Sequence, residues 1–311
     1  MISYMITGGA GFIGSHLIRK LLTKDNKVTV VDNLITGDLR NIGDYVNNKN
    51  FEFLNHDIQE SLYLDKEIHH VIHLASCASP KAYSEYPINT LKSGSIGTIN
   101  ALGIAKKHNA KFFLASTSEV YGDPQVSPQD ENYWGNVNTL GPRSMYDESK
   151  RFAESATKAY ITTHGIHANI ARIFNTYGPN MQIDDGRVVT NFIYQAINNE
   201  DITIYGTGNQ TRSFSFIEDT LDGLLKVINY KNSEVFNIGS ENEITVKHLA
   251  ETIVSLTNSN SKIIYKDLPE NDPKQRKPDL TKAKEQLSYV PRYSLEEGLK
   301  ITIDWINKTY K

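Results

Sequence analysis

The chain has 311 residues, of which 39% are hydrophobic and 22% charged, and its formal net charge is -3. A globular protein with its own core fits these values, whereas a nucleic-acid or anionic-membrane partner would favour a concentrated basic surface. Cys77 is the single cysteine, so we expect no internal disulfide. No apolar run reaches the roughly 20 residues that span a bilayer, so we expect no membrane segment. A strand pattern begins at Ile2, so we expect no signal peptide and a cytoplasmic location.

Short apolar runs alternate with amphipathic segments through the first 177 residues. Strands are predicted at Ile2–Thr7, Val28–Asp32, Phe51–Asn55, His70–Ala75, Lys111–Ser116 and Ala168–Ile173, and helices at Ser15–Leu22, Ser95–His108 and Tyr146–His164. Parallel neighbours need crossover connections of this kind, and burial on both faces explains the nearly continuous apolar strands. The pattern predicts an α/β fold with a Rossmann-type doubly wound parallel sheet over residues 1–177.

The regular alternation of predicted strands and helices ends after residue 178. The sequence then predicts a loop at Asn180–Arg187, a helix at Val188–Asn198 and a strand at Ile202–Tyr205. The remainder contains two more helical stretches and a charged loop at Pro269–Pro278. We expect residues 212–240 to return to the first domain, with Phe214–Phe216 and Val235–Ile238 as candidate strands of the main sheet. The remainder of 178–311 is predicted to form a smaller C-terminal substrate-binding lobe.

A glycine-rich turn follows the first predicted strand and opens the first helix. Its sequence is Gly8-Gly9-Ala10-Gly11-Phe12-Ile13-Gly14, and Asp32 ends the second strand 18 positions after Gly14. Glycines let the backbone approach a pyrophosphate at a helix N-terminus, and the carboxylate binds ribose hydroxyls while disfavouring the extra phosphate of NADP. A plain strand–turn–helix corner would explain the glycines alone, but the full context favours an NAD site.

Tyr146 and Lys150 stand four residues apart on a predicted helix, which places both side chains on one face. An ammonium beside a phenol favours the phenolate, so we expect a lowered tyrosine pKa and a base for a sugar hydroxyl. Thr117, Ser118 and Glu119 follow a strand and reach the ligand-binding edge of the sheet. Glu119 is expected to act as an acid/base group or as a like charge that strains a bound carboxylate.

Longer stretches add a family resemblance that covers essentially the whole chain. They are Val31-Asp32-Asn33, Thr36-Gly37, His73–Ser76, Ala115–Pro124, Arg172–Pro179, Asp185–Val189, Gln210–Arg212 and Asp272–Asp279. In these stretches the chain resembles the extended short-chain dehydrogenase/reductase family of NAD-dependent nucleotide-sugar epimerases and dehydratases. Cys77 and Gly94 depart from the proline and asparagine that are frequent there.

Within that family the resemblance is greatest to members that convert UDP-glucuronate to UDP-xylose by C4 oxidation, loss of carbon dioxide and re-reduction at C4. It implies that Tyr146 is the base, Lys150 its partner and Arg276 the catalytic arginine, while Thr117, Ser118 and Glu119 position the sugar. A nucleotide-sugar 4,6-dehydratase or 4-epimerase is the alternative. A catalytically inactive cofactor-binding regulator is a further one, although it would typically lose Tyr146 or Lys150.

The resemblance also assigns binding residues and partners. Cofactor contacts are expected from Gly8, Gly11, Phe12, Ile13, Gly14, Asp32, Asn33, Thr36, Gly37, Asp57, Ile58, Leu74, Ser76, Tyr146, Lys150, Thr176 and Arg187. Contacts with a UDP-sugar are expected from Lys92, Asn175, Tyr205, Gln210, Arg212 and Arg276. A homodimer is implied through the helices at 95–108 and 146–164. No metal site is expected, because strand alternation would separate His69, His70 and His73.

Overall fold

A parallel sheet forms the centre of the molecule, as predicted, and it has seven strands. The computed structural model describes residues 1–267 and 275–310, so positions 269–274 of the predicted charged loop lie outside the described residues. The strand order is β11-β6-β5-β4-β1-β2-β3. The strands are β1 (Ile2–Thr7), β2 (Asn26–Asp32), β3 (Phe51–Asn55), β4 (His70–His73), β5 (Lys111–Thr117), β6 (Ala168–Ile173) and β11 (Val235–Ile238).

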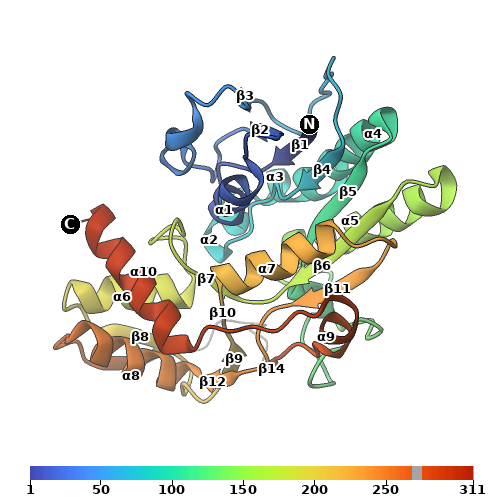
Figure 1. Cartoon of the computed structure of the whole chain (residues 1–311). Coiled ribbons are helices and arrows are strands. Elements are labelled where there is room, and N and C mark those ends of the chain that lie inside the picture. The colour runs from blue at the N-terminus through green and yellow to red at the C-terminus, as the bar shows by residue number, and fades with distance from the viewer. Residues whose placement is uncertain (268–274, 311) are drawn as a thin grey trace.

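Helices cover both faces of this sheet (Figure 1). On one face lie α1 (Phe12–Leu21) and α7 (Ile217–Ile228), and on the other lie α4 (Thr98–His108) and α5 (Ser144–His164). Along β1 the side chains of Tyr4 and Ile6 enter one core while Met5 enters the other. This alternation is what a strand buried on both sides requires.

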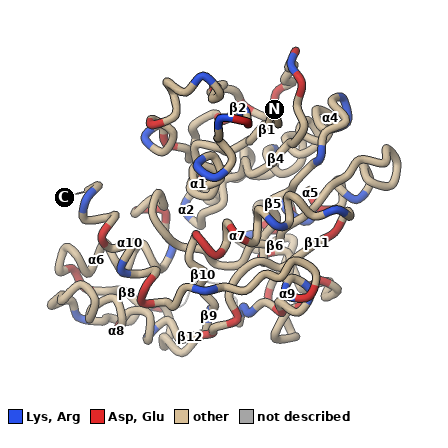
Figure 2. The backbone as a smooth tube through the Cα atoms, in the orientation of Figure 1, with Lys and Arg blue, Asp and Glu red and all other residues tan. Residues whose placement is uncertain are grey.

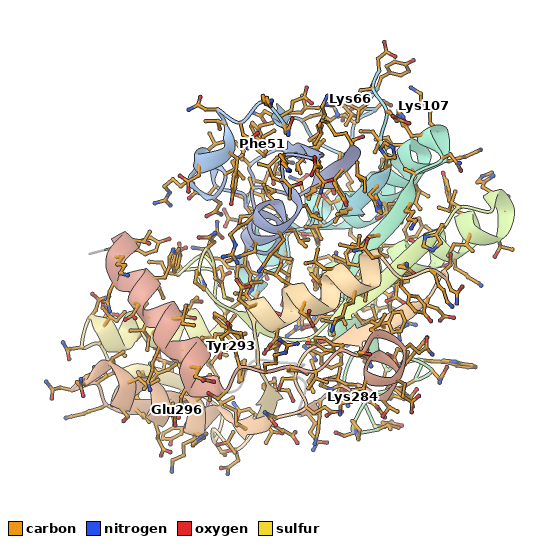
Figure 3. The ribbon with its side chains drawn as sticks, in the orientation of Figure 1. Phe51, Lys66, Lys107, Lys284, Tyr293 and Glu296 are labelled. Carbon is orange, nitrogen blue, oxygen red and sulfur yellow. The ribbon has the colours of Figure 1, made fainter. Side chains whose placement is uncertain are left out.

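The C-terminal part of the chain builds a smaller lobe below the sheet (Figure 1). Its helices are α6 (Val188–Ile197), α8 (Val246–Thr257), α9 (Thr281–Leu287) and α10 (Leu295–Tyr310), and its strands are β8 (Ile202–Tyr205), β9 (Thr211–Ser213), β12 (Glu243–Thr245), β13 (Ile263–Lys266) and β14 (Gln275–Arg276). Tyr293 packs where the lobe meets α7, with its ring 4.8 Å from that of Phe216 (Figure 3). Its backbone N–H and that of Arg292 donate to Asp219 of α7.

Three local features differ from the prediction. Helix α1 begins at Phe12 rather than Ser15, because the glycine turn leads straight into it. A π-helical turn, η3 (Ser93–Gly97), precedes α4, following the short helices α2 (Pro80–Glu85) and α3 (Pro87–Lys92). Val235–Ile238 joins the main sheet beside β6, but β10 (Ser215–Phe216) pairs instead with β7 (Thr176–Tyr177) in a separate sheet.

Charged side chains of both signs are spread over the sheet domain and the lobe (Figure 2). Among the residues that the structure describes, no helix has the length and apolar character to cross a membrane. Within the same residues, no three His, Cys, Asp or Glu side chains gather in a way that would hold a metal ion.

Candidate active site

One cavity of about 640 Å³ runs from the glycine turn, past the carboxyl ends of the central strands, to the lobe. It lies where the strand order reverses between β1 and β4, which is where open α/β sheets bind ligands. All the predicted catalytic and cofactor residues line it, and so do Asn175, Tyr205, Gln210 and Arg212. Lys92 does not, because it is exposed at the end of α3.

The glycine turn fits the pyrophosphate of a dinucleotide. Gly8 has a φ of +71°, and a Cβ there would lie 2.7 Å from the backbone nitrogen of Ala75 on the neighbouring chain segment. A Cβ at Gly14 would meet the carbonyl oxygen of Gly8. Gly11 is the N-cap residue of α1 and has no side chain to accept the first N–H groups of the helix. These N–H groups therefore stay available for a phosphate bound at the helix N-terminus.

Asp32 and its neighbours fit the adenosine end of that cofactor. The Asp32 carboxylate is 8% exposed and accepts the backbone N–H groups of Ala10 and Leu34, both at 2.9 Å. Burial raises its pKa, while these two bonds act against the rise. Each oxygen keeps further acceptor capacity for ribose hydroxyls. A Cβ at Gly37 would lie 2.8 Å from Oδ1 of Asp32, so glycine keeps this approach open.

Tyr146 and Lys150 meet in the middle of the cavity. The Tyr146 ring is 6% exposed and stacks on Tyr83 with 5.4 Å between centroids and 15° between planes. The Lys150 Nζ lies 5.8 Å from the centroid of the Tyr146 ring and donates to the carbonyl oxygen of Ala115 at 2.9 Å. The predicted convergence of these two side chains on the cavity is therefore present.

The predicted lowering of the tyrosine pKa is wrong for the protein's own residues. Burial raises the pKa of Tyr146, and the nearby Glu119 carboxylate adds to the rise. The ammonium that was expected to oppose this is itself buried, which lowers the pKa of Lys150 to about 8, and its proton is directed at Ala115.

Glu119 lies in the turn η4 (Ser118–Tyr121) and is held by two arginines. The two terminal nitrogens of Arg276, Nη1 and Nη2, donate to its carboxylate, Nη2 at 2.8 Å, and Nη2 of Arg143 contacts Oε1 at 2.6 Å. Burial alone would raise the Glu119 pKa, but the two positive charges outweigh it and hold the pKa below its usual value. Glu119 is therefore ionised at neutral pH, so it has the negative charge that the second of its two expected roles requires and has no proton to donate as an acid.

Arg143 and two buried amides are functional candidates that the sequence reasoning missed. Arg143 lines the cavity three residues before Tyr146, and the Pro142-Arg143 pair at the start of the helix was the available signal. Gln129 and Asn237 are fully buried and bind the chain just after Arg276. Gln129 pairs with Lys277 and Asp279, and Asn237 donates to the Asp279 carbonyl.

Comparison with known proteins gives a consistent result. The sequence profile of the GDP-mannose 4,6 dehydratase family matches residues 5–302. The chain belongs to this family, within the extended short-chain dehydrogenases/reductases. It is 49% identical over 304 residues, or 98% of its length, to UDP-glucuronic acid decarboxylase 1 of Xenopus tropicalis, and this alignment covers 72% of that protein.

Solved structures of family members share the whole fold. A UDP-glucose 4-epimerase from Thermotoga maritima with UDP-glucose has a TM-score of 0.90 and 30% identity, and the match covers 100% of both chains. The UDP-glucuronic acid 4-epimerase from Bacillus cereus, in complex with UDP-glucuronic acid and NAD, has a TM-score of 0.88 and 27% identity, covering 99% of this chain and 100% of that one. The sheet and lobe described above are therefore those of the family.

Gly94, one departure from the family pattern, has a steric explanation. A Cβ at position 94 would lie 2.6 Å from the Cβ of Ser149, the residue before Lys150. The π-helical turn and α5 thus approach each other more closely than two side chains would allow. Glycine at 94 therefore permits the close approach of this turn to α5.

Asp147, beside the tyrosine of the family motif, should make stability depend on pH. Burial, followed by the Glu119 charge, raises its pKa to about 7. Between about pH 4 and 7 the folded state then keeps a proton that the unfolded state has lost, so this group lowers the free energy of unfolding as pH rises. Asp147→Asn should therefore raise the Tm, measured by thermal unfolding, more at pH 8 than at pH 5.

The exposed Asp65 provides the matched control for this prediction, because Asp65→Asn removes the same charge from the surface. An equal effect of Asp147→Asn at the two pH values would show that the buried carboxyl does not titrate in this range.

Proposed function

We propose that the chain decarboxylates UDP-glucuronate to UDP-xylose with NAD as a cofactor that is regenerated in each cycle. The observation that carries the proposal is the buried Arg276–Glu119 pair beside Tyr146, at the sugar end of a cavity whose other end fits a dinucleotide. The relatives named UDP-glucuronic acid decarboxylases, 46–49% identical over nearly the whole chain, support the same activity.

Electron flow explains why a reaction without net oxidation would need a redox cofactor. When bound, NAD supplies a reversible acceptor for the hydride at C4 of the sugar. A ketone at C4 is β to the C6 carboxylate, so it accepts the electron pair of the breaking C5–C6 bond as carbon dioxide leaves. C5 is then protonated and the hydride returns to C4, which balances electrons.

Tyr146 accepts the proton of the C4 hydroxyl and returns it at the end of the cycle. Lys150 lies on the same side of α5 as Tyr146, and its ammonium donates to the carbonyl oxygen of Ala115 in β5. It keeps a positive charge near the phenol. Thr117 forms a hydrogen bond with Tyr146 that favours its deprotonated form, and it also accepts the backbone N–H of Glu119 at 3.2 Å. Thr117 thereby orients the base, and Ser118, which lines the cavity beside it, is the proposed contact for the sugar hydroxyl.

Arg276 stabilises the negative charge that develops on the sugar oxygen during loss of carbon dioxide. Its side chain is 4% exposed, so its charge acts in a site from which most water is excluded. Asn175, Tyr205, Gln210 and Arg212 line the lobe side of the cavity and are the proposed contacts for the UDP part. Lys92, exposed outside the cavity, gains no support as one of them.

The proposed homodimer has a candidate surface on the helices that cover one face of the sheet. Large apolar side chains are exposed there on α3, η3, α4 and α5, namely Ile88, Leu91, Ile96, Ile99 and Phe152. Apolar side chains that gather on adjacent elements are typical of a contact surface. The cytoplasmic location remains a prediction of the sequence.

Incubation of the purified chain with UDP-glucuronate, without added cofactor and followed by NMR, tests the function. We expect UDP-xylose and carbon dioxide, because NAD that is regenerated in every turnover can stay bound from purification. UDP-galacturonate from the same incubation would identify a 4-epimerase, and a 4-keto-6-deoxy sugar from UDP- or dTDP-glucose would identify a 4,6-dehydratase. Either result would replace the proposal.

A further inference from the structure

We infer that His73 is a positioning residue that connects the cofactor end of the cavity to α5, the helix of Tyr146 and Lys150. Its neutral imidazole links the backbone of Leu74 and Ala75, which line the cavity, to the π-helical turn η3, which packs against α5. His73 is not among the described residues that line the cavity, so it acts through these neighbours. The inference rests on one step of the proposed function, the oxidation at C4.

The hydrogen bonds of Thr98 fix which ring nitrogen of His73 has the proton. The Thr98 hydroxyl donates to the carbonyl oxygen of Gly94 at 2.8 Å, and this uses its single proton. Toward Nε2 of His73, 3.1 Å away, the hydroxyl can therefore only accept. Nε2 thus has the proton, and Nδ1 of the neutral ring is left as an acceptor.

The hydroxyl of Thr7 completes the chain of hydrogen bonds on the other side of the ring. It lies 2.8 Å from Nδ1 of His73 and accepts the backbone N–H groups of Leu74 and Ala75 at 3.2 and 3.3 Å. Both lone pairs are then occupied, so the hydroxyl proton is directed at Nδ1. A charged ring would place another N–H against this hydroxyl, so the geometry requires a neutral one.

This chain of hydrogen bonds is closed to solvent. Thr7 and Thr98 are fully buried, and His73 is 2% exposed. Burial, followed by the charge of Lys150, lowers the pKa of His73 to about 3, so the ring stays neutral at neutral pH. A buried network in which each proton has one acceptor holds its members in a single arrangement.

Both ends of the chain lie where the backbone has no room to shift. At one end, a Cβ on Gly8 would lie 2.7 Å from the backbone nitrogen of Ala75. At the other end, a Cβ on Gly94 would lie 2.6 Å from the Cβ of Ser149, the residue before Lys150. Loss of the link through His73 would let the two ends move relative to each other, and with them the cofactor site and the base.

The proton position is measured by NMR on the unaltered chain with isotope-labelled histidine. Correlations of the ring nitrogens with the carbon-bound ring protons distinguish the two neutral forms from the charged one. We expect a neutral ring with its proton on Nε2, assigned by the loss of its signals in His73→Phe. A proton on Nδ1, or a charged ring at neutral pH, would overturn the inference whatever reaction the chain catalyses.

The variants Thr98→Val and His73→Phe test whether the link positions the base. Each keeps a side chain of similar shape and removes hydrogen bonds of the link. We expect each to lower kcat per bound NAD by about 10- to 100-fold, because small displacements in an active site are costly in rate. KM for UDP-glucuronate should change by less than about twofold, because the proposed contacts of the UDP part are untouched. The double variant should be no slower than His73→Phe, since both changes break one link.

His70→Phe is the matched control. His70 lies on the same strand, is 9% exposed and stacks on Tyr4 with 4.9 Å between ring centroids, on the α1 side of the sheet. We expect it to keep its full kcat. A merely structural His73 would lower the Tm and the NAD content but leave kcat per bound NAD unchanged, and this result would overturn the inference. So would losses in kcat that multiply in the double variant.

Failure of the proposed function would be seen separately, because it concerns the unaltered chain. Oxidation at C4 also opens the 4-epimerase and 4,6-dehydratase reactions, so the same variants would then be assayed with the nucleotide sugar that the chain does convert. Normal kcat values in Thr98→Val and His73→Phe refute the role of His73 alone. Failure of the unaltered chain to form UDP-xylose refutes the function alone, and the proton position still decides on the link.

Discussion

Tyr146→Phe should lower kcat for UDP-glucuronate by about 10²- to 10⁴-fold, the usual contribution of a positioned acid/base group. Phenylalanine keeps the ring that stacks on Tyr83, so the cavity should keep its shape. It removes only the oxygen that accepts the C4 proton. The measurement is UDP-xylose formation by NMR, together with the amount of NAD released when the purified variant is denatured.

Tyr160→Phe is the matched control, because Tyr160 lies on the same helix as Tyr146. Within the described part of the chain, the one aromatic ring that packs against the Tyr160 ring is that of His164. We expect it to be as active as the unaltered chain. Two results would contradict the role of Tyr146: a variant that retains most of its activity, or one whose loss of activity simply follows a loss of bound NAD.

The resting pKa of Tyr146 shows a limit of reasoning from spacing. A four-residue interval on a helix correctly brought Tyr146 and Lys150 to one cavity, since that geometry is local. Whether the ammonium lowers the phenol pKa depends on the burial of Tyr146, which packs against Ala82 and Tyr83 of α2, and on the lysine proton, which is directed at Ala115 of β5. These are contacts between segments far apart in the sequence.

The same distinction explains which parts of the fold were predictable. Apolar runs such as Ile2–Thr7 and Lys111–Ser116 mark buried strands through their own composition, and glycines at 8, 11 and 14 mark the turn through its steric needs. The pairing of Ser215–Phe216 with Thr176–Tyr177 was missed, because a two-residue strand has almost no pattern of its own. Tertiary contacts decide such short elements.

Arg276 was identified through the family resemblance and not from local chemistry. It contacts Glu119 across 157 positions of sequence, and by itself it is one cation in a charged loop. Gln129 and Asn237, which hold the chain beside it, are ordinary polar residues in the sequence. Only burial shows their importance, because a fully buried amide must be hydrogen-bonded.

Glu154→Gln should destabilise the chain by about 2 kcal/mol, because it leaves a largely buried guanidinium without its counter-ion, at somewhat less than the cost of a fully buried pair. Both oxygens of Glu154 accept from Arg172, at 2.9 and 2.8 Å, and the two side chains are only 13–14% exposed. Ser116 at the end of β5 donates to the same carboxylate at 2.5 Å. One largely buried ion pair thus ties α5, which carries Tyr146 and Lys150, to β5 and β6.

Thermal and urea unfolding measure this effect, and the same helix offers a control. Glu148→Gln breaks an exposed pair with Arg151, 3.9 Å apart at i,i+3, and should cost less than about 0.5 kcal/mol. Replacing Arg172 by leucine in the Glu154→Gln protein removes the unpaired charge and should recover part of the loss. If Glu148→Gln and Glu154→Gln were equally harmful, simple loss of helix charge would explain both, and the Arg172–Glu154 pair would not be what holds α5 to the sheet.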